Sequence, residues 1–120
     1  MESRDLWNNG GRLPLEIIAR RLKAMAEPSR LSLLHLLCES EMSVTRLVQR
    51  TGLSQASVSK HLRVLREEGL VDSRRESRMI YYRLKSSMPK EICDHVCRSI
   101  EEDVERERKR LGEYWRRSNE

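Results

Sequence analysis

One stretch, Thr51–Leu70, limits the fold of this chain more than any other. Gly52 can adopt the left-handed backbone conformation that ends a helix, and Ser54 is a favoured N-cap for a helix that starts directly after it. Apolar residues then recur at i, i+4 and i+7, as they do on one face of a helix: Val58, Leu62 and Leu65. Gly69 ends the pattern. The stretch therefore predicts the turn and second helix of a helix-turn-helix.

The opposite face of this predicted helix carries short or flexible hydrogen-bonding side chains and few acids. These are Ser54, Gln55, Ser57, Ser59, Lys60 and Arg63. Such a helix fits the major groove of DNA, where polar side chains near its first turns reach base edges. An ordinary amphipathic surface helix is the competing interpretation, so the rest of the chain has to decide between the two.

The net charge of +5 is concentrated on and just after this helix. Residues 54–85 contain eight Lys and Arg against four Asp and Glu, whereas residues 1–53 have a net charge of +2 and residues 86–120 one of −1. A cationic patch of this kind is the electrostatic footprint of a nucleic-acid-binding surface. The remaining composition, 38% hydrophobic and 36% charged without any Phe, indicates a small α-rich domain with a thin core that benefits from a partner subunit.

Three helices are predicted before the turn. Pro14 is favoured in a first helical turn, Pro28 cannot continue the helix before it, and Ser43 is a suitable N-cap. These boundaries place the helices at about 14–26, 29–38 and 43–51. The second is apolar on most sides and is therefore expected at the centre of the core.

Two short strands are predicted after the recognition helix, at 70–73 and 79–84, because β-branched and aromatic residues are frequent there. The loop between them contains Arg74, Arg75 and Arg78. An isolated basic loop usually serves only solubility. Beside a recognition helix, however, it is typical of a wing that contacts phosphates or the minor groove.

A last helix is predicted from Pro89 to about residue 112. Its apolar stripe consists of Ile92, Cys93, Val96, Cys97, Ile100, Val104 and Leu111. A terminal helix must bury such a stripe, most simply against the first helix and the same helices of a second subunit. We therefore expect a mainly α winged helix-turn-helix of order α-α-α-α-β-β-α over residues 13–112, dimerising through its first and last helices. A flexible arm is expected at 1–12 and a tail at 113–120, frayed over residues 116–120.

Several classes of protein are disfavoured. The first 25 residues lack the apolar core of a signal peptide, and no apolar run has transmembrane length. Three cysteines are an odd number without disulfide-framework spacing, which indicates a reducing cytoplasm. We expect no enzyme activity, because there is no Cys-x-x-Cys, no Gly-rich phosphate loop and no credible catalytic triad. A winged helix that contacts an acidic protein remains an alternative to DNA binding.

Four blocks of the sequence together resemble the ArsR/SmtB family of bacterial repressors. They are residues Leu22–Leu31, Leu53–Leu62, Leu65–Val71 and Tyr81–Leu84, and the similarity extends over roughly residues 15–104. The resemblance implies a homodimer that occupies operator DNA until an inducer releases it, with the first and last helices at the dimer interface.

The inducer sites of that family vary, and two of them lack their residues here. The arsenic-type site resembles a Cys-x-Cys on the helix before the turn, where residues 44–50 contain no Cys. The zinc-type site on the last helix corresponds to Ser86, Met88, Ser99 and Glu102, of which only Glu102 can ligate a metal.

Cys38, Cys93 and Cys97 remain as candidate inducer residues. Cys93 and Cys97 are spaced i, i+4 on one helix face, and some family members that sense reactive sulfur resemble an arrangement with one Cys on the second helix and one on the last. Three thiolates suit arsenite, antimonite or zinc, whereas two suit persulfide or peroxide chemistry. A purely structural role for all three, as small buried hydrophobes, is the third alternative.

Overall fold

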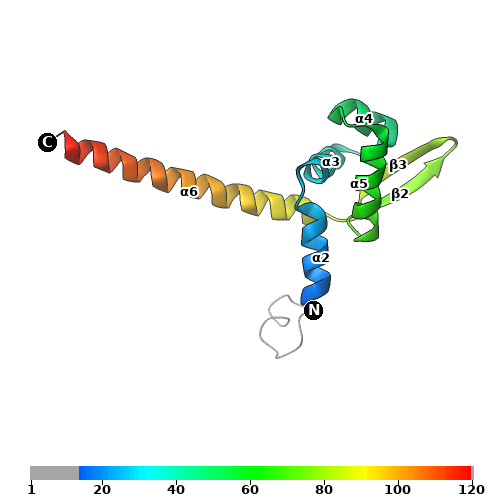
Figure 1. Cartoon of the computed structure of the whole chain (residues 1–120), viewed down its shortest axis with the longest axis horizontal. Helices are drawn as coiled ribbons and strands as arrows, with labels where there is room; N and C mark the ends of the chain where they lie inside the picture. The colour runs from blue at the N-terminus through cyan, green and yellow to red at the C-terminus, as the bar shows by residue number, and fades with distance from the viewer. Residues whose placement is uncertain (1–13, 120) are drawn as a thin grey trace. The chain divides into compact units, whose positions relative to one another are not determined.

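The computed structural model describes residues 14–119 and divides the chain into two units, Met1–Ser86 and Ser87–Glu120. The expected arm at 1–12 lies outside the described residues. The described residues of the first unit form four helices and a small sheet, which are drawn from blue to yellow-green in Figure 1, and those of the second form one helix.

The four predicted helices of the first unit are confirmed. They are α2 (Leu15–Met25), α3 (Pro28–Glu39), α4 (Val44–Thr51) and α5 (Gln55–Glu67). Serine caps start the last two, since the Oγ of Ser43 accepts a hydrogen bond from the backbone N–H of Arg46 and that of Ser54 from the N–H of Ser57, each at 3.1 Å. Gly52 ends α4 with a φ of 73°, and Gly69 follows α5 with a φ of 74°. The local sequence therefore sets the helix-turn-helix boundaries.

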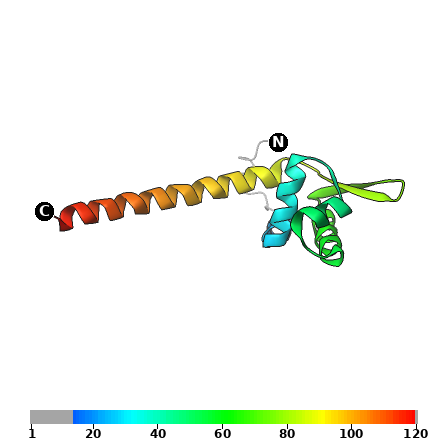
Figure 2. The ribbon, with the colours of Figure 1, turned by 90° about the horizontal axis from the view of Figure 1, so that it is seen from above.

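The sheet is larger than the sequence predicted. Strands β1 (Met42–Ser43), β2 (Val71–Glu76) and β3 (Met79–Leu84) form an antiparallel sheet in the order β1-β3-β2. The prediction of a loop over 74–78 is wrong for residues 74–76, because Arg74 pairs with Tyr81 and Arg75 with Ile80 in the β2–β3 ladder, and right for Ser77 and Arg78, which form the turn between the strands. Cross-strand pairing thus extends β2 through charged residues of low strand propensity. The β2–β3 hairpin projects beyond the helices of its unit (Figures 1 and 2).

The core of the first unit forms where α3, α4 and α5 pack together and against the sheet. Its fully buried side chains are Leu33, Leu47, Val58, Leu62, Leu65, Leu70 and Val71. The α5 stripe predicted from the sequence is part of this core. Because this stripe faces inward, the polar face of α5 is turned outward.

The second unit is the single helix α6 (Met88–Ser118). The helix thus includes most of the predicted tail at 113–120, and the prediction that residues 116–120 are frayed is wrong as far as Ser118. The helix continues because charged pairs three residues apart follow one another along it, at Asp103–Arg106, Glu105–Arg108 and Glu107–Arg110. None of the described helices combines the length and apolar character that a membrane span needs.

Candidate nucleic-acid interface

The outward face of α5 carries most of the predicted recognition residues. Gln55, Ser59, Lys60 and Arg63 are exposed, while Ser57 is half-buried. The hydroxyl of Ser54 is occupied as the helix cap, where it accepts the N–H of Ser57. The helix thus presents an amide, a hydroxyl and two cations in its first two and a half turns, which is the chemistry that reads base edges and phosphates.

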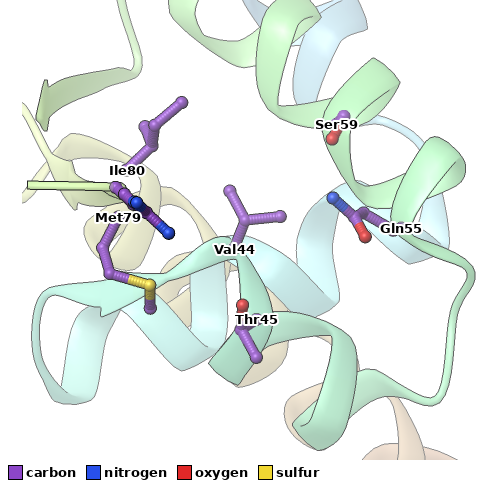
Figure 3. A pocket seen from close by; sticks show the side chains of 7 residues that line it. Val44, Thr45, Gln55, Ser59, Met79 and Ile80 are labelled. Carbon is purple, nitrogen blue, oxygen red and sulfur yellow. The ribbon is translucent and has the colours of Figure 1, made fainter.

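A pocket of about 170 Å³ separates the start of α5 from the wing. Its lining consists of Val44, Thr45, Gln55, Ser59, Arg78, Met79 and Ile80. Figure 3 shows Gln55 and Ser59 on one side and Met79 and Ile80 on the other. The sequence had suggested no role for Thr45. Thr45 lies two residues after Ser43, the N-cap of α4. This position in the first turn of α4 could have indicated that its hydroxyl lies beside the recognition helix.

Arg74 differs from Arg75 and Arg78 because its guanidinium is bound to acids of its own chain. Its guanidinium donates hydrogen bonds to the Oε1 of Glu41 at 2.6 and 2.9 Å and to the Oε2 of Glu76 at 2.7 Å. The same guanidinium lies 4.7 Å from the centroid of the Tyr81 ring. These hydrogen bonds raise the pKa of Arg74 and lower the pKa of Glu41. Arg74 therefore links the wing to the residues before α4.

Four other predicted contact residues are available for a partner. The side chains of Lys60, Arg63, Arg75 and Arg78 are exposed and form no hydrogen bond or ion pair with other described residues. Two lie on α5, one on β2 and one in the turn between the strands. The sequence grouped all three wing arginines together, and the structure separates Arg74 from Arg75 and Arg78.

His61 packs against the start of α3. Its side chain is 16% exposed, and its Nδ1 lies 3.5 Å from Arg30 and 3.8 Å from the carboxylate of Glu27. Glu27 caps α3 by accepting the N–H of Arg30, and this hydrogen bond is the main reason that its pKa is lowered. Arg30 also donates to the carbonyl oxygens of Lys23 and Ala24 at the end of α2. His61 thus joins α5 to a cluster that holds three helices together.

All three cysteines have exposed side chains in the single chain. Cys38 lies near the end of α3, and Cys93 and Cys97 lie one turn apart on α6. The thiol of Cys97 donates a hydrogen bond to Glu101 at 3.7 Å, and the charge of that carboxylate, followed by desolvation, raises the pKa of Cys97. Within either unit, the described residues include no group of three or more His, Cys, Asp and Glu arranged to hold a metal.

The apolar stripes of the first and last helices are also exposed. On α2, Leu15, Ile18 and Leu22 are 61%, 38% and 45% exposed, and only the end of the stripe, Met25, is buried. On α6, Val96, Ile100, Val104 and Leu111 are each more than half exposed. Large apolar patches of this kind on a small protein mark surfaces that a partner covers.

The fold and this surface define a winged helix-turn-helix protein. A family profile described as "Bacterial regulatory protein, arsR family" matches residues 27–73. The nodulation protein NolR of Rhizobium meliloti is 48% identical over 67 residues, which cover 56% of this chain and 55% of NolR. The activator HlyU of Vibrio cholerae is 42% identical over 73 residues, which cover 61% of this chain and 68% of HlyU. The chain thus spans between about half and two thirds of the length of these relatives.

Solved structures agree with the sequence comparisons. HlyU from V. cholerae superimposes with a TM-score of 0.65 at 36% identity, covering 73% of this chain and 96% of HlyU. A homodimeric winged helix-turn-helix DNA-binding domain from Mycobacterium bovis gives a TM-score of 0.68 at 31% identity over 80% of this chain and 94% of its own. The chain belongs to the ArsR family of bacterial transcriptional regulators.

Proposed function

We propose that this protein is a homodimeric repressor that binds operator DNA through the polar face of α5 and the β2–β3 wing. The observation that carries the proposal is the set of exposed side chains, Lys60, Arg63, Arg75 and Arg78, that have no acidic partner among the described residues. Each can replace a condensed counterion on a DNA phosphate, and Gln55 and Ser59 between them can reach base edges.

We propose that two copies of the chain bind one operator together. The exposed stripes on α2 and α6 support dimerisation, and the related M. bovis domain is described as homodimeric. In such a dimer, each subunit places one α5 in successive major grooves of a pseudo-palindrome, about one DNA turn apart.

The salt dependence of binding tests the proposed contacts. An operator is first selected in vitro with the full chain, and its affinity is then measured at several salt concentrations. Lys60→Ala and Arg75→Ala each lower the slope of log K against log salt by about one phosphate equivalent. Lys23→Ala is the matched control, because it removes an exposed cation of α2 whose side chain has no acidic partner among the described residues, and its slope remains that of the wild type. Wild-type slopes in both test variants would contradict the assignment of these contacts.

Repression is the direction of control that we propose. The biofilm growth-associated repressor of Xylella fastidiosa carries this role in its name, whereas HlyU is named an activator. Transcription in vitro from a promoter that overlaps the selected operator distinguishes the two. A decrease in transcript upon addition of protein supports repression, and an increase contradicts it.

The proposed inducer acts on the thiols of Cys38, Cys93 and Cys97, whose exposure leaves them accessible in the single chain. The raised pKa of Cys97 disfavours its thiolate. Titration of the DNA complex with arsenite, zinc, polysulfide or peroxide, on the wild type and on each Cys→Ser variant, identifies the inducer class. Wild-type release in all three single variants would leave the cysteines with a structural role.

A further inference from the structure

Two exposed apolar residues lie at the start of β3, although the hairpin around them is charged. Met79 and Ile80 are 37% and 44% exposed, whereas the end of β2 that pairs with them consists of Arg75 and Glu76. Single exposed apolar residues are ordinary, but these two line the same pocket, the one of about 170 Å³ between the wing and the start of α5. The pocket therefore has an apolar wall on a surface that is otherwise polar.

The register of the sheet places Ile80 on the face that α5 packs against. Ile80 pairs with Arg75, and Leu84 pairs with Val71 at the other end of the hairpin. Because side chains alternate along a strand and paired residues share a face, Ile80, Arg75 and Val71 lie on one face of the sheet. Val71 is buried where β2 packs against α5, so Ile80 continues the same face beyond the core. Ile80 thus shares its face with Arg75, a proposed phosphate contact, and lies opposite to Arg74.

The other wall of the pocket is polar. Gln55 and Ser59 are four residues apart on α5 and lie on one face of that helix, and Thr45 lies in the first turn of α4. All three are exposed, and their side chains form no hydrogen bond with other described residues. Figure 3 shows Val44 between this wall and Ile80. Hydrogen-bonding groups thus lie across the pocket from aliphatic side chains.

An A·T base pair presents a matching edge in the major groove. Its adenine offers N7 and the N6 amino group, which a glutamine can bind with two hydrogen bonds, and its thymine offers O4 and an apolar 5-methyl group. A G·C pair offers no methyl group there. The pocket volume of about 170 Å³ is far above the roughly 10–15 Å³ that holds one water molecule, so a methyl group and the ring edge that carries it fit.

We propose that this pocket reads one thymine in each operator half-site by its 5-methyl group, which packs against Ile80 and Val44 while Gln55 binds the adenine of that pair. The inference rests on the proposed DNA binding and adds the base that is recognised between α5 and the wing. Ile80 thereby contributes to sequence preference, whereas Arg75 and Arg78 bind phosphates of any sequence. A phosphate in the pocket would instead be desolvated by an apolar wall that offers it no hydrogen bond.

Replacing thymine by deoxyuracil tests the pocket, because it removes one methyl group and leaves base pairing and charge unchanged. The operator selected with the full chain is remade with each thymine position replaced in turn, in both half-sites together, and the affinity of the wild type is measured. We expect one position at which the replacement weakens binding by about fourfold per half-site, the effect of exposing one buried methyl group.

Two variants assign this effect to the pocket. Ile80→Ala removes most of the apolar wall, so the replacement at that position has little further effect on its affinity. Ile17→Ala is the matched control, because it removes the same atoms from a position on α2 that is 53% exposed, and its response to the replacement remains fourfold. Each variant is judged by the ratio of its affinities for the two operators, so a general loss of affinity does not change the result.

A fourfold ratio that persists in Ile80→Ala would place the methyl contact elsewhere and overturn the proposal. Ratios near one at every thymine would also overturn it, and a phosphate in the pocket would give this result. The proposed DNA binding would remain intact in both cases, provided that Lys60→Ala and Arg75→Ala still lower the salt slope. Failure to select any operator would contradict the proposed function itself, and this inference with it.

Discussion

Helices α5 and α6 both carry apolar residues at helical spacing, yet their surroundings differ completely. The α5 stripe, Val58, Leu62 and Leu65, is 0% exposed, because α3, α4 and the sheet pack around it. Val104 on α6 is 62% exposed. The same sequence pattern thus has two outcomes: in the first unit it builds a core within one chain, and in α6 it leaves an exposed apolar surface, which we propose a second chain covers.

The largest expected effect is the loss of stability when a stripe residue of the core is truncated, compared with a stripe residue of α6. Leu62→Ala lowers the free energy of unfolding by about 2–5 kcal/mol, because it removes three carbons from a packed core and leaves a cavity. Val104→Ala, in contrast, leaves the unfolding of the first unit unchanged and weakens dimerisation. Urea denaturation at protein concentrations below the dimerisation range, combined with sedimentation, measures both. Equal losses of stability in the two variants would remove the distinction between the regions.

The next largest effects are expected from Gly→Ala substitutions, which should have opposite signs in the first unit and in α6. Gly52 and Gly69 have φ values of 73° and 74°, so alanine at either position costs about 1–2 kcal/mol of stability. A Cβ at Gly69 would also lie 3.0 Å from the guanidinium of Arg21, which is flexible enough to move. Gly112, inside α6, has open space around it, and Gly112→Ala is expected to stabilise the helix by about 1 kcal/mol. Thermal unfolding of the three variants, compared with circular dichroism of α6 helicity, tests these opposite signs; a loss of helicity in Gly112→Ala would contradict them.

A smaller effect is expected from the wing, where two adjacent arginines have different surroundings. Arg74→Ala removes a cation that Glu41 and Glu76 already neutralise, so the salt slope of DNA binding stays close to that of the wild type. Arg75→Ala removes a cation without such partners and lowers the slope. Binding isotherms of both variants at matched salt concentrations provide the measurement. If both variants lowered the slope equally, Arg74 would have to leave Glu41 and Glu76 in order to contact DNA.

The sequence predicted the parts of the fold that depend on neighbours along the chain. Ser43, Ser54 and Gly52 set helix ends through hydrogen bonds or backbone angles within a few residues, and each has the predicted place. The i, i+4, i+7 stripe of α5 also identified the buried face, and thereby the outward face that carries the candidate site.

The features that the sequence did not predict depend on residues far apart in the chain. Strand β1 has two residues and exists only because Met42 and Ser43 pair with Tyr82 and Tyr81. Arg74 and Glu41 are 33 residues apart, so nothing local indicated that they form an ion pair. Whether Cys38 lies close enough to Cys93 and Cys97 to share one inducer is a question of the same kind. It depends on the assembly of two units and stays a prediction.

The smallest expected effect concerns the pH dependence of the link between Glu41 and Arg74. The hydrogen bond from Arg74 lowers the pKa of Glu41 below the ordinary value of 4.5 for a glutamate, so the ionised carboxylate is favoured in the folded state. Its contribution to stability is therefore complete above about pH 4.5 and is lost as the pH falls through the lower, folded-state pKa. Glu41→Gln should be slightly less stable than the wild type at pH 7, and the difference should shrink below pH 4.5. Urea midpoints at a series of pH values measure the difference between the two proteins. If the difference in urea midpoint between the two proteins stayed constant with pH, the effect of Glu41 would come from packing rather than from charge. The wing would then be attached to the rest of the first unit mainly by its strand pairing.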